Sequence, residues 1–323
     1  MLQDTFGRRF HYLRLSVTDM CNFRCNYCLP DGVDCHQPTD YLTLNEIKTL
    51  VAAFAQMGTS KVRITGGEPA LRKDLTEIIH ICQQTPGIEQ VALTTNGFNL
   101  DQKIEDFVAA GLTAVNVSAD SLDPRMFAAI TGKNMLERVM RGVDAAIAAG
   151  LTKVKLNTVL LRQYNTQEFD LFLGYLKNHS VTWRFIELMQ TGDNADFFGR
   201  NHVAGETLQK RLVANGWERI VRDKQAGPAL EYRHEKYRGQ VGLIMPYSKD
   251  FCQSCNRLRV SSQGNVHLCL FAEQGFSIRP YLQQGDIQAT CEAIQTLMKN
   301  KLASHSLQQG FTGATRQLAM LGG

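Results

Sequence analysis

The feature that most limits the fold is a regular alternation of strand-like and helix-like segments from residue 13 to about residue 189. Short runs typical of strands stand at Leu13–Val17, Lys61–Thr65, Gln90–Thr95, Ala114–Ser118, Lys153–Leu160 and Thr182–Leu188. Amphipathic helical patterns lie between them, at Leu44–Met57, Asp74–Gln83, Ile104–Ala110, Leu136–Ala149 and Gln167–Asn178. Such alternation indicates parallel strands joined by right-handed crossovers. The sequence therefore predicts an α/β fold with six units, a partial (βα)6 TIM-like barrel rather than a closed eight-stranded one.

The pattern changes after about residue 190, where Gly192, Asp193 and Asn194 indicate a loop. The segments that follow are a helical pattern at Glu206–Asn215, strand-like pieces at Trp217–Arg222, Leu230–Tyr232 and Gln240–Ile244, and a helical tail from about Asp286 to Leu302. We therefore expect two domains, a barrel over residues 1–195 and a C-terminal α+β domain over residues 196–323.

Several expected strands carry charged residues at every second position. Arg14 flanks Leu15, Lys61 and Arg63 flank Val62, and Lys155 lies two residues after Lys153. Period-two spacing places such residues on one face of a strand. Because helices should cover the outside of the barrel, the polar face should line its interior, which must then hold water and a polar ligand. A solvent-facing edge strand could explain one such pattern but hardly three or four.

Composition narrows the classes of function. The net charge is +4 and 20% of the residues are charged, which suits a soluble globular protein with an anionic small-molecule site rather than a duplex-binding protein. No apolar stretch approaches the ~20 residues that span a bilayer, and residues 1–10 lack the apolar core of a secretory signal. Six of nine cysteines form two groups, which indicates metal binding in the cytoplasm rather than a disulfide framework.

The first group, Cys21, Cys25 and Cys28, follows the first expected strand with spacing x3 and x2. A four-iron cluster normally takes four cysteines, so three would leave one iron open, as at a metal site that performs chemistry. The alternative is a structural zinc site that takes a fourth ligand from elsewhere, such as His36.

The second group, Cys252, Cys255 and Cys269, again offers three thiolates and predicts a second cluster with an open iron. A zinc ribbon completed by His267 is the alternative. Arg257 and Arg259 follow with period-two spacing, and arginine favours bidentate contacts with phosphate oxygens. Together with the cations of the barrel interior, they indicate a polyanion such as a triphosphate.

The cysteine spacing, the aromatic Tyr27 before Cys28 and the Gly-Gly-Glu-Pro segment at 66–69 resemble the radical S-adenosylmethionine (SAM) superfamily. The resemblance implies a partial six-unit barrel in which three cysteines hold a [4Fe–4S] cluster whose open iron chelates SAM. Cleavage of SAM then gives a 5′-deoxyadenosyl radical that takes hydrogen from the substrate. It also implies SAM contacts at Tyr27, Gly67, Ser118 and Met189.

Within that superfamily, the chain resembles the GTP 3′,8-cyclase family of molybdenum cofactor biosynthesis nearly end to end. The segments that carry this resemblance include residues 6–8, 13–19, 63–69, 95–97, 116–118 and 251–259 and the terminal Gly322-Gly323. The resemblance implies a second [4Fe–4S] cluster that binds the guanine of GTP, and an active-site role for the Gly322-Gly323 tail. The implied GTP contacts are Arg14, Arg63, Thr94, Lys155, Arg257 and Arg259, with Lys61 and Arg184 as additions.

The implied reaction starts when the radical takes hydrogen from ribose C3′, after which the carbon radical attacks guanine C8. An electron and a proton complete (8S)-3′,8-cyclo-7,8-dihydroguanosine 5′-triphosphate. The implied partners are a low-potential electron donor of the flavodoxin or ferredoxin type and a downstream cyclic pyranopterin monophosphate synthase. A homodimer is a possible assembly, and neither nucleic acid nor membrane is expected as a partner.

Two other interpretations remain open from the sequence. A peptide-modifying radical enzyme with an auxiliary cluster would need no triphosphate site, so it would not bind GTP. A zinc-stabilised protein that binds nucleotides or RNA without catalysis would contain zinc and no iron.

Overall fold

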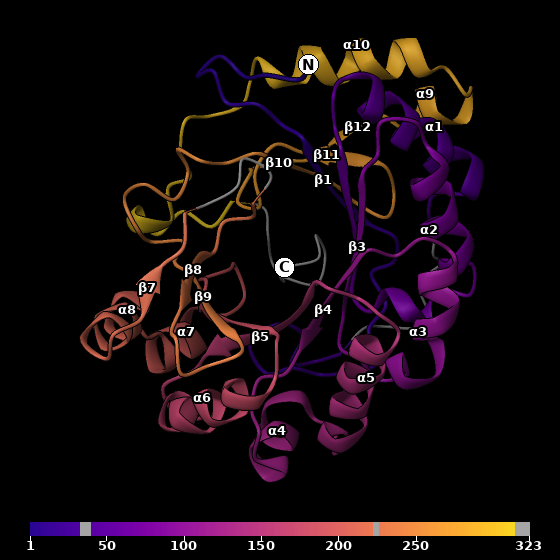
Figure 1. Cartoon of the computed structure of the whole chain (residues 1–323). Coiled ribbons are helices and arrows are strands. Elements are labelled where there is room, and N and C mark those ends of the chain that lie inside the picture. Colours follow the sequence, from indigo (N-terminus) through magenta and orange to yellow (C-terminus); the bar gives the residue numbers. More distant parts are fainter. Residues whose placement is uncertain (33–39, 222–225, 314–323) are drawn as a thin grey trace.

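The computed structural model describes residues 1–32, 40–221 and 226–313, and its centre is a curved sheet wrapped by helices (Figure 1). Six parallel strands form the barrel wall, namely β1 (Tyr12–Ser16), β2 (Lys61–Thr65), β3 (Gln90–Thr95), β4 (Ala114–Ser118), β5 (Val154–Leu160) and β6 (Thr182–Glu187). These bounds agree with the six predicted strands to within a residue or two. The partial barrel is confirmed.

Helices follow the strands and cover the outer face of the sheet (Figure 1). They are α1 (Leu44–Gln56), α2 (Leu75–Gln84), α3 (Leu100–Ala109), α4 (Pro124–Thr131), α5 (Leu136–Ala148) and α6 (Phe169–Asn178). Between sheet and helices lies the main core, in which Leu13, Leu15, Val62 and Ile64 are fully buried. The apolar positions of each alternating strand therefore face the helices, and the polar positions face inward as predicted.

The sequence did not predict α4, although its start carries clear signals. Asp123 accepts hydrogen bonds from the backbone N–H groups of Arg125 and Met126, and Pro124 occupies the first helical position. The start of α1 carries a capping box: the Thr43 hydroxyl accepts from the Glu46 N–H, and the Glu46 carboxylate accepts from the Thr43 N–H.

The C-terminal part continues the same sheet at both ends. It supplies α7 (Ala195–Asn201), α8 (Gly205–Ala214), β7 (Glu218–Arg219), β8 (Leu230–Arg233), β9 (Gln240–Ile244), β10 (Arg257–Val260), β11 (Asn265–His267), β12 (Phe276–Ser277), α9 (Arg279–Gln283) and α10 (Ile287–Met298). Over the described residues the strand order is β12-β11-β10-β1-β2-β3-β4-β5-β6-β9-β8-β7. Strand β9 pairs in parallel with β6, and β10 pairs in parallel with β1.

The six-strand barrel is thus widened at both edges by parallel strands from the C-terminal part, which the sequence did not predict. Three short 3-10 helices complete the described elements, at Pro69–Leu71, Thr166–Glu168 and Leu307–Gln309. No helix among the described residues is both long enough and apolar enough to cross a membrane. Cys35, His36 and the Gly322-Gly323 tail lie outside the described residues.

Candidate active site inside the barrel

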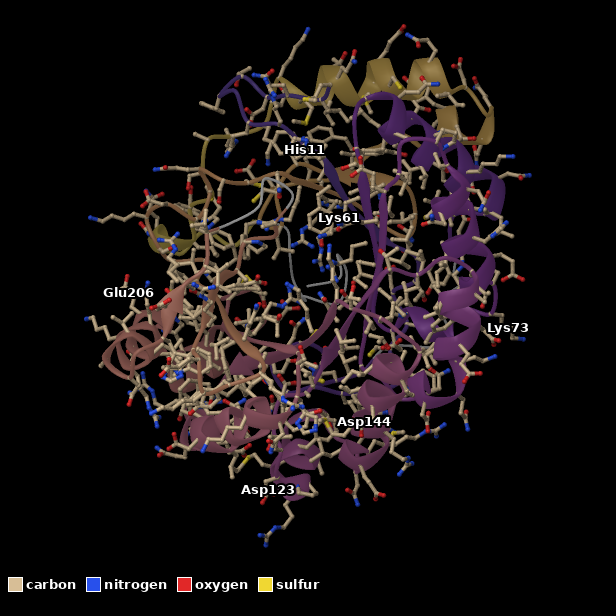
Figure 2. All side chains as sticks on the ribbon, in the orientation of Figure 1. His11, Lys61, Lys73, Asp123, Asp144 and Glu206 are labelled. Carbon is tan, nitrogen blue, oxygen red and sulfur yellow. The ribbon has the colours of Figure 1, made fainter. Side chains whose placement is uncertain are left out.

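One cavity of about 1250 Å³, counting the space at its mouth, occupies the interior of the sheet. Its lining contains all eight residues predicted to contact a triphosphate nucleotide: Arg14, Lys61, Arg63, Thr94, Lys155, Arg184, Arg257 and Arg259. It also contains the second cysteine group and Met189. Lys61 lies toward the middle of the molecule, whereas Lys73, Asp123 and Glu206 lie at its periphery (Figure 2). Residues more than 240 positions apart in the sequence therefore meet in one chamber.

Strand register explains why the cations converge. Arg259 pairs with Arg14 across β10 and β1, and Arg14 pairs with Arg63 across β1 and β2. Side chains at paired positions share one face of a sheet, so the three guanidinium groups form a row on the inner wall. Farther along the sheet, Arg184 is paired with Gly242, where an added Cβ would stand 2.7 Å from Arg184 Cγ. A glycine at 242 thus leaves space for an arginine in the interior.

The cations are held in place by polar neighbours. Arg63 donates from Nη1 to Thr94 Oγ1 over 3.2 Å and from Nε to the phenol oxygen of Tyr12. Arg184 donates from Nε to Asn157 Oδ1 over 3.0 Å, and Lys155 Nζ lies 2.5 Å from Glu231 Oε1. Each side chain is thereby fixed before any ligand binds, which lowers the entropy lost on binding.

Crowding of positive charge inside the barrel changes the pKa values of these groups. Burial lowers the pKa of Lys61 to about 8, and Arg63 adds to this effect. Burial and Arg63 lower the pKa of Arg184 to about 9. Burial, with Arg14 and Arg257, lowers the pKa of Arg259 well below its usual value. A site that disfavours its own charges in this way is a site for a polyanion.

The second cysteine group lies in the cavity wall beside this row. Burial raises the pKa of the Cys252 thiol, but hydrogen bonds from His305 and Ser304 lower it to about 6. Burial likewise raises the pKa of Cys255, while the positive charges of Arg257 and Lys301 lower it overall. The environment therefore favours thiolates, the form that binds metal.

Arg8 connects the N-terminal turn to this cysteine loop. It donates from Nη1 to the carbonyl oxygens of Cys252 and Ala303, over 3.0 and 2.6 Å, and from Nη2 to that of Leu302 over 2.6 Å. Its Nε lies 2.6 Å from Asp4 Oδ2. The resemblance included this arginine, and the structure supplies its physical role.

We expect Arg8→Gln to destabilise the protein by about 2 kcal/mol, because charge-assisted hydrogen bonds to three carbonyl groups are lost. Thermal unfolding measures this as a lower midpoint. Arg9→Gln is the matched control, since Arg9 is exposed and its neighbour does the binding. Equal midpoints for the two variants would contradict the role of Arg8.

The first cysteine group follows β1 at the carboxyl edge of the barrel. Burial raises the pKa of Cys25 well above its usual value, and the nearby Asp120, Cys28 and Cys21 raise it further. The three thiols thus lie close enough to feel one another's charge. Leu270, which lines the cavity, packs against Cys28, Tyr27 and Met189. The loop therefore reaches the chamber that holds the cations.

The Gly-Gly-Glu-Pro segment holds this loop by direct backbone contact. The Gly67 N–H donates to the Thr18 carbonyl over 2.9 Å, and the Glu68 N–H donates to that of Met20 over 2.7 Å. A Cβ on Gly67 would stand 2.3 Å from the Met20 oxygen. Glycine is needed here because two backbone segments touch.

Glu68 is the buried centre of a second support. Its carboxylate accepts from the Thr95 hydroxyl over 2.7 Å and from the Asn96 N–H over 2.6 Å, and burial raises its pKa to about 7. The Asn96 side chain then donates to Asn22 Oδ1 over 2.8 Å, inside the cysteine loop. The ends of β2 and β3 therefore fix the position of Cys21.

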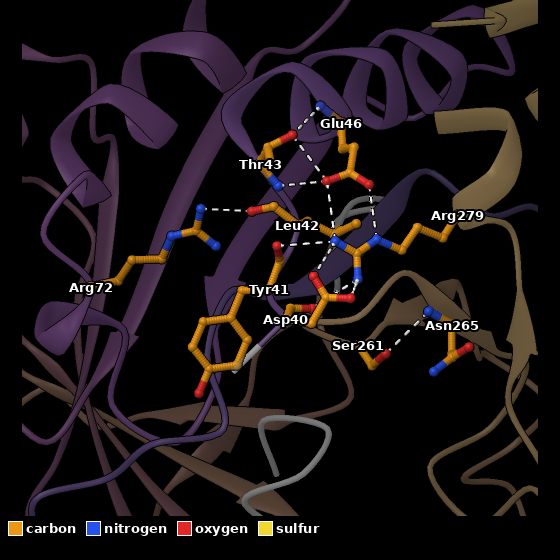
Figure 3. Close-up of polar contacts among 9 residues, drawn as sticks. All are labelled: Asp40, Tyr41, Leu42, Thr43, Glu46, Arg72, Ser261, Asn265 and Arg279. Atoms are coloured by element: carbon orange, nitrogen blue, oxygen red, sulfur yellow. Dashed lines mark hydrogen bonds and ion pairs between the residues drawn. The ribbon is translucent and has the colours of Figure 1, made fainter. Parts of the chain in front are cut away.

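The C-terminal part holds the segment that leads from this loop into α1 (Figure 3). Arg279 of α9 donates from Nη1 to Asp40 Oδ2 over 2.7 Å and from Nε to Glu46 Oε1 over 2.9 Å. Ser262 donates to Asp19 Oδ1 over 2.8 Å, two residues before Cys21. Both ends of the first cysteine loop are thus tied to the part of the chain that carries the second group.

The residues predicted to contact SAM follow the strands at one edge of the barrel: Tyr27 after β1, Gly67 after β2, Ser118 at the end of β4 and Met189 after β6. Tyr27 donates from its hydroxyl to Asp120 Oδ2 over 2.9 Å. Sequence reasoning missed three groups of the cavity wall, Tyr12, Glu231 and His305. Tyr12 has the same parity as Arg14 and could have been found; nothing in the sequence indicated the other two.

Both cysteine groups suit iron–sulfur clusters by the chemistry of their donors, since each brings three free thiols together. In the part of the chain that the structure describes, no three His, Cys, Asp or Glu side chains are arranged to hold a single metal ion.

Comparisons with known proteins agree with this geometry. Residues 15–176 match the Radical SAM superfamily, and residues 181–307 match the family described as Molybdenum Cofactor Synthesis C. The GTP 3′,8-cyclase of Vibrio cholerae serotype O1 is 52% identical over 99% of this chain and 97% of its own. That of Shewanella denitrificans is 51% identical over 100% of this chain and 96% of its own.

Two solved structures share the fold. Streptococcus suis SuiB bound to S-adenosylmethionine has a TM-score of 0.59 at 13% identity, covering 90% of this chain and 68% of its own. The enzyme anSMEcpe with bound AdoMet has a TM-score of 0.57 at 12% identity, covering 89% and 83%. With the relatives above, they place the cysteine loop, the barrel and the C-terminal part in one known arrangement. The chain therefore belongs to the GTP 3′,8-cyclase family of the radical SAM superfamily.

Proposed function

We propose that this chain converts GTP to (8S)-3′,8-cyclo-7,8-dihydroguanosine 5′-triphosphate, the first step of molybdenum cofactor biosynthesis. The observation that carries the proposal is a single chamber lined by seven cationic side chains, Thr94 and three cysteine thiols. The curated relatives named GTP 3′,8-cyclase, at 52% and 51% identity, support it. Neither a peptide-modifying enzyme nor a zinc protein without catalysis explains why so many cations face one interior space.

Electrostatics supports a triphosphate as the ligand. Arg14, Arg63 and Arg259 form one row, and gathering like charges away from water is unfavourable unless an anion compensates them. Guanidinium groups present paired N–H donors that match phosphate oxygens. We assign the phosphates and ribose of GTP to the eight predicted residues: Arg14, Lys61, Arg63, Thr94, Lys155, Arg184, Arg257 and Arg259.

The first cysteine group is assigned the [4Fe–4S] cluster that superfamily members use with SAM. When bound, these two groups supply a 5′-deoxyadenosyl radical that takes hydrogen from ribose C3′. Tyr27, Gly67, Ser118 and Met189 are assigned to orient SAM. Because the Gly67 N–H already donates to Thr18, its carbonyl is the group that we assign to SAM. Leu270 packs between this loop and the chamber, and so limits the entry of water.

Cys252, Cys255 and Cys269 are assigned a second [4Fe–4S] cluster that holds the guanine. Cationic neighbours support this assignment. Lys301 donates to the Leu268 carbonyl and, after burial, lowers the pKa of Cys255 together with Arg257. The two cysteine groups would then face the substrate from opposite ends, one at its ribose and one at its base.

Further parts of the proposal concern the surroundings of the enzyme. We include a cytoplasmic location, a low-potential donor of the flavodoxin or ferredoxin type, and a cyclic pyranopterin monophosphate synthase as the next enzyme. A homodimer, a functional division near residue 195 and an active-site role for the Gly322-Gly323 tail remain predictions from the sequence.

The decisive experiment is an anaerobic reaction of the reconstituted protein with GTP, SAM and a chemical reductant. We expect 5′-deoxyadenosine and the 3′,8-cyclised nucleotide in equal amounts, identified by mass spectrometry. About eight irons per chain are expected if both clusters have four. Zinc without iron, or SAM cleavage without any GTP-derived product, would refute the proposal.

We expect Arg257→Ala and Arg259→Ala each to weaken GTP binding by about 10- to 100-fold, the loss of a charge-assisted contact with phosphate. Equilibrium binding of radiolabelled GTP measures the effect. Arg219→Ala is the matched control, because Arg219 lies in β7 and is exposed. Unchanged affinity in both test variants would remove these arginines from the substrate site.

A further inference from the structure

Tyr12 occupies an unusual place among the cations of the cavity. It is the first residue of β1, where it pairs with Lys61 on one side and Arg257 on the other. Only 4% of its surface is exposed, yet it lines the chamber. Aromatic residues at such positions usually fill space, but this one carries an ionisable oxygen in the middle of the positively charged wall.

The phenol oxygen is a direct acceptor for the side chains assigned to the triphosphate. Arg63 donates to it from Nε, which leaves the outer guanidinium edge of Arg63 for other partners. Lys61 Nζ lies 4.8 Å from the centre of the phenol ring, and Arg63 Cζ lies 5.8 Å from it. The phenol oxygen thus stands where an anion would stand if the site were filled by phosphate.

Charged groups surround Tyr12 from every neighbouring strand. Arg14 lies on its own strand, Lys61 and Arg63 on β2, Arg184 on β6, and Arg257 and Arg259 on β10. The carboxylate of the wall, Glu231, is paired with Lys155. Burial raises the pKa of Tyr12, but Arg63, Arg14, Lys61 and the hydrogen bond from Arg63 bring it down to about 6.

We propose that Tyr12 is a positioning residue that acts as an exchangeable counter-ion of the triphosphate site. Its phenolate oxygen holds Arg63, Arg14 and Lys61 in place until phosphate oxygens take over their charge, and it then takes up a proton from solvent. This inference rests on the proposed function and extends it to Tyr12, a residue that lies outside the sequence motifs by which the chain resembles its family.

The sign of the coupling follows from charge alone. A bound polyphosphate brings negative charge close to the phenol, which raises its pKa. At neutral pH the group is then ionised before binding and protonated after it. By linkage, GTP affinity should fall as the pH rises above the pKa of free Tyr12. The proton that is taken up remains inside the chamber, on the phenol oxygen.

The test follows the near-ultraviolet band of ionised tyrosine in the holoenzyme, with inorganic triphosphate as the probe because it has no absorbance there. We expect a band that appears with an apparent pKa near 6 and moves up by about 1 to 3 units at saturating triphosphate. Tyr12→Phe should lack this band and lose the matching pH dependence of GTP affinity, while circular dichroism checks that it is folded.

Tyr175→Phe is the matched control. Burial raises the pKa of Tyr175 to about 12, so removing its hydroxyl should leave the band near neutral pH unchanged. If all tyrosines of the free protein ionise near the ordinary value of about 10, the inference is wrong. If triphosphate and GTP bind but the band does not move, it is also wrong, while the proposed function stands. If neither binds, the proposed function itself fails.

Discussion

Replacement of Cys28 by serine is expected to abolish formation of 5′-deoxyadenosine, with a loss of more than about 100-fold, beyond the 10- to 100-fold typical of residues that only support a metal ligand. A cluster with one open iron depends on three thiolates, and serine is a poor iron ligand. Cys28 packs beside Leu270 at the edge of the chamber, so the exchange hardly changes the packing there. Product is measured by chromatography after anaerobic reaction with SAM and reductant.

The control is Cys82→Ala, which removes a thiol buried within α2, away from both cysteine groups. It should retain SAM cleavage, with a stability loss of about 1 kcal/mol or less. Binding of GTP to Cys28→Ser should match the wild type, because the triphosphate residues lie on other strands. If Cys28→Ser still cleaves SAM, the first cysteine group does not hold the catalytic cluster.

Much of the barrel could be predicted because two periodicities coincide in it. Arg14, Lys61, Arg63 and Lys155 alternate with apolar residues that the helices cover, and the structure confirms that they line one cavity. The burial of Leu13, Leu15, Val62 and Ile64 follows the same rule. Local pattern and global position agree here because each strand has one wet face and one dry face.

The widening of the sheet could not be predicted from local pattern. Strand β10 is only four residues long and pairs with β1 across more than 240 positions of sequence. Its arginines alternate just as those of a solvent-exposed strand would, so the pattern does not indicate its partner. Glu231 and His305 entered the chamber through the same long-range contacts, and no local signal marks either of them.

The support of the first cysteine loop could be predicted only in part. Gly-Gly-Glu-Pro was predicted to present backbone groups to a ligand, yet the structure shows the Gly67 and Glu68 N–H groups donating to Thr18 and Met20. Which backbone approaches a glycine depends on tertiary packing, which sequence spacing does not describe. The buried Glu68 carboxylate, with Thr95 and Asn96 as donors, is visible only in three dimensions.

Gly67→Ala is therefore expected to have the second large effect, through geometry rather than chemistry. The added Cβ would stand 2.3 Å from the Met20 oxygen, 2.6 Å from the Met20 carbonyl carbon and 2.7 Å from the Asp19 oxygen. All three are backbone atoms, so the segment that leads into Cys21 must move. We expect a stability loss of about 1–3 kcal/mol and a fall of more than about tenfold in SAM cleavage.

Gly174→Ala is the matched control, since an added Cβ there meets no atom within 4 Å and the position lies inside α6. The same substitution should then stabilise the protein slightly, by about 0.5–1 kcal/mol, because alanine favours helix. Denaturant unfolding, SAM cleavage and GTP binding are measured for both variants. Because the triphosphate row lies on strand interiors, Gly67→Ala should keep its GTP affinity. Equal stability and equal SAM cleavage in the two variants would mean that the contact between Gly67 and Met20 does not position the cysteine loop.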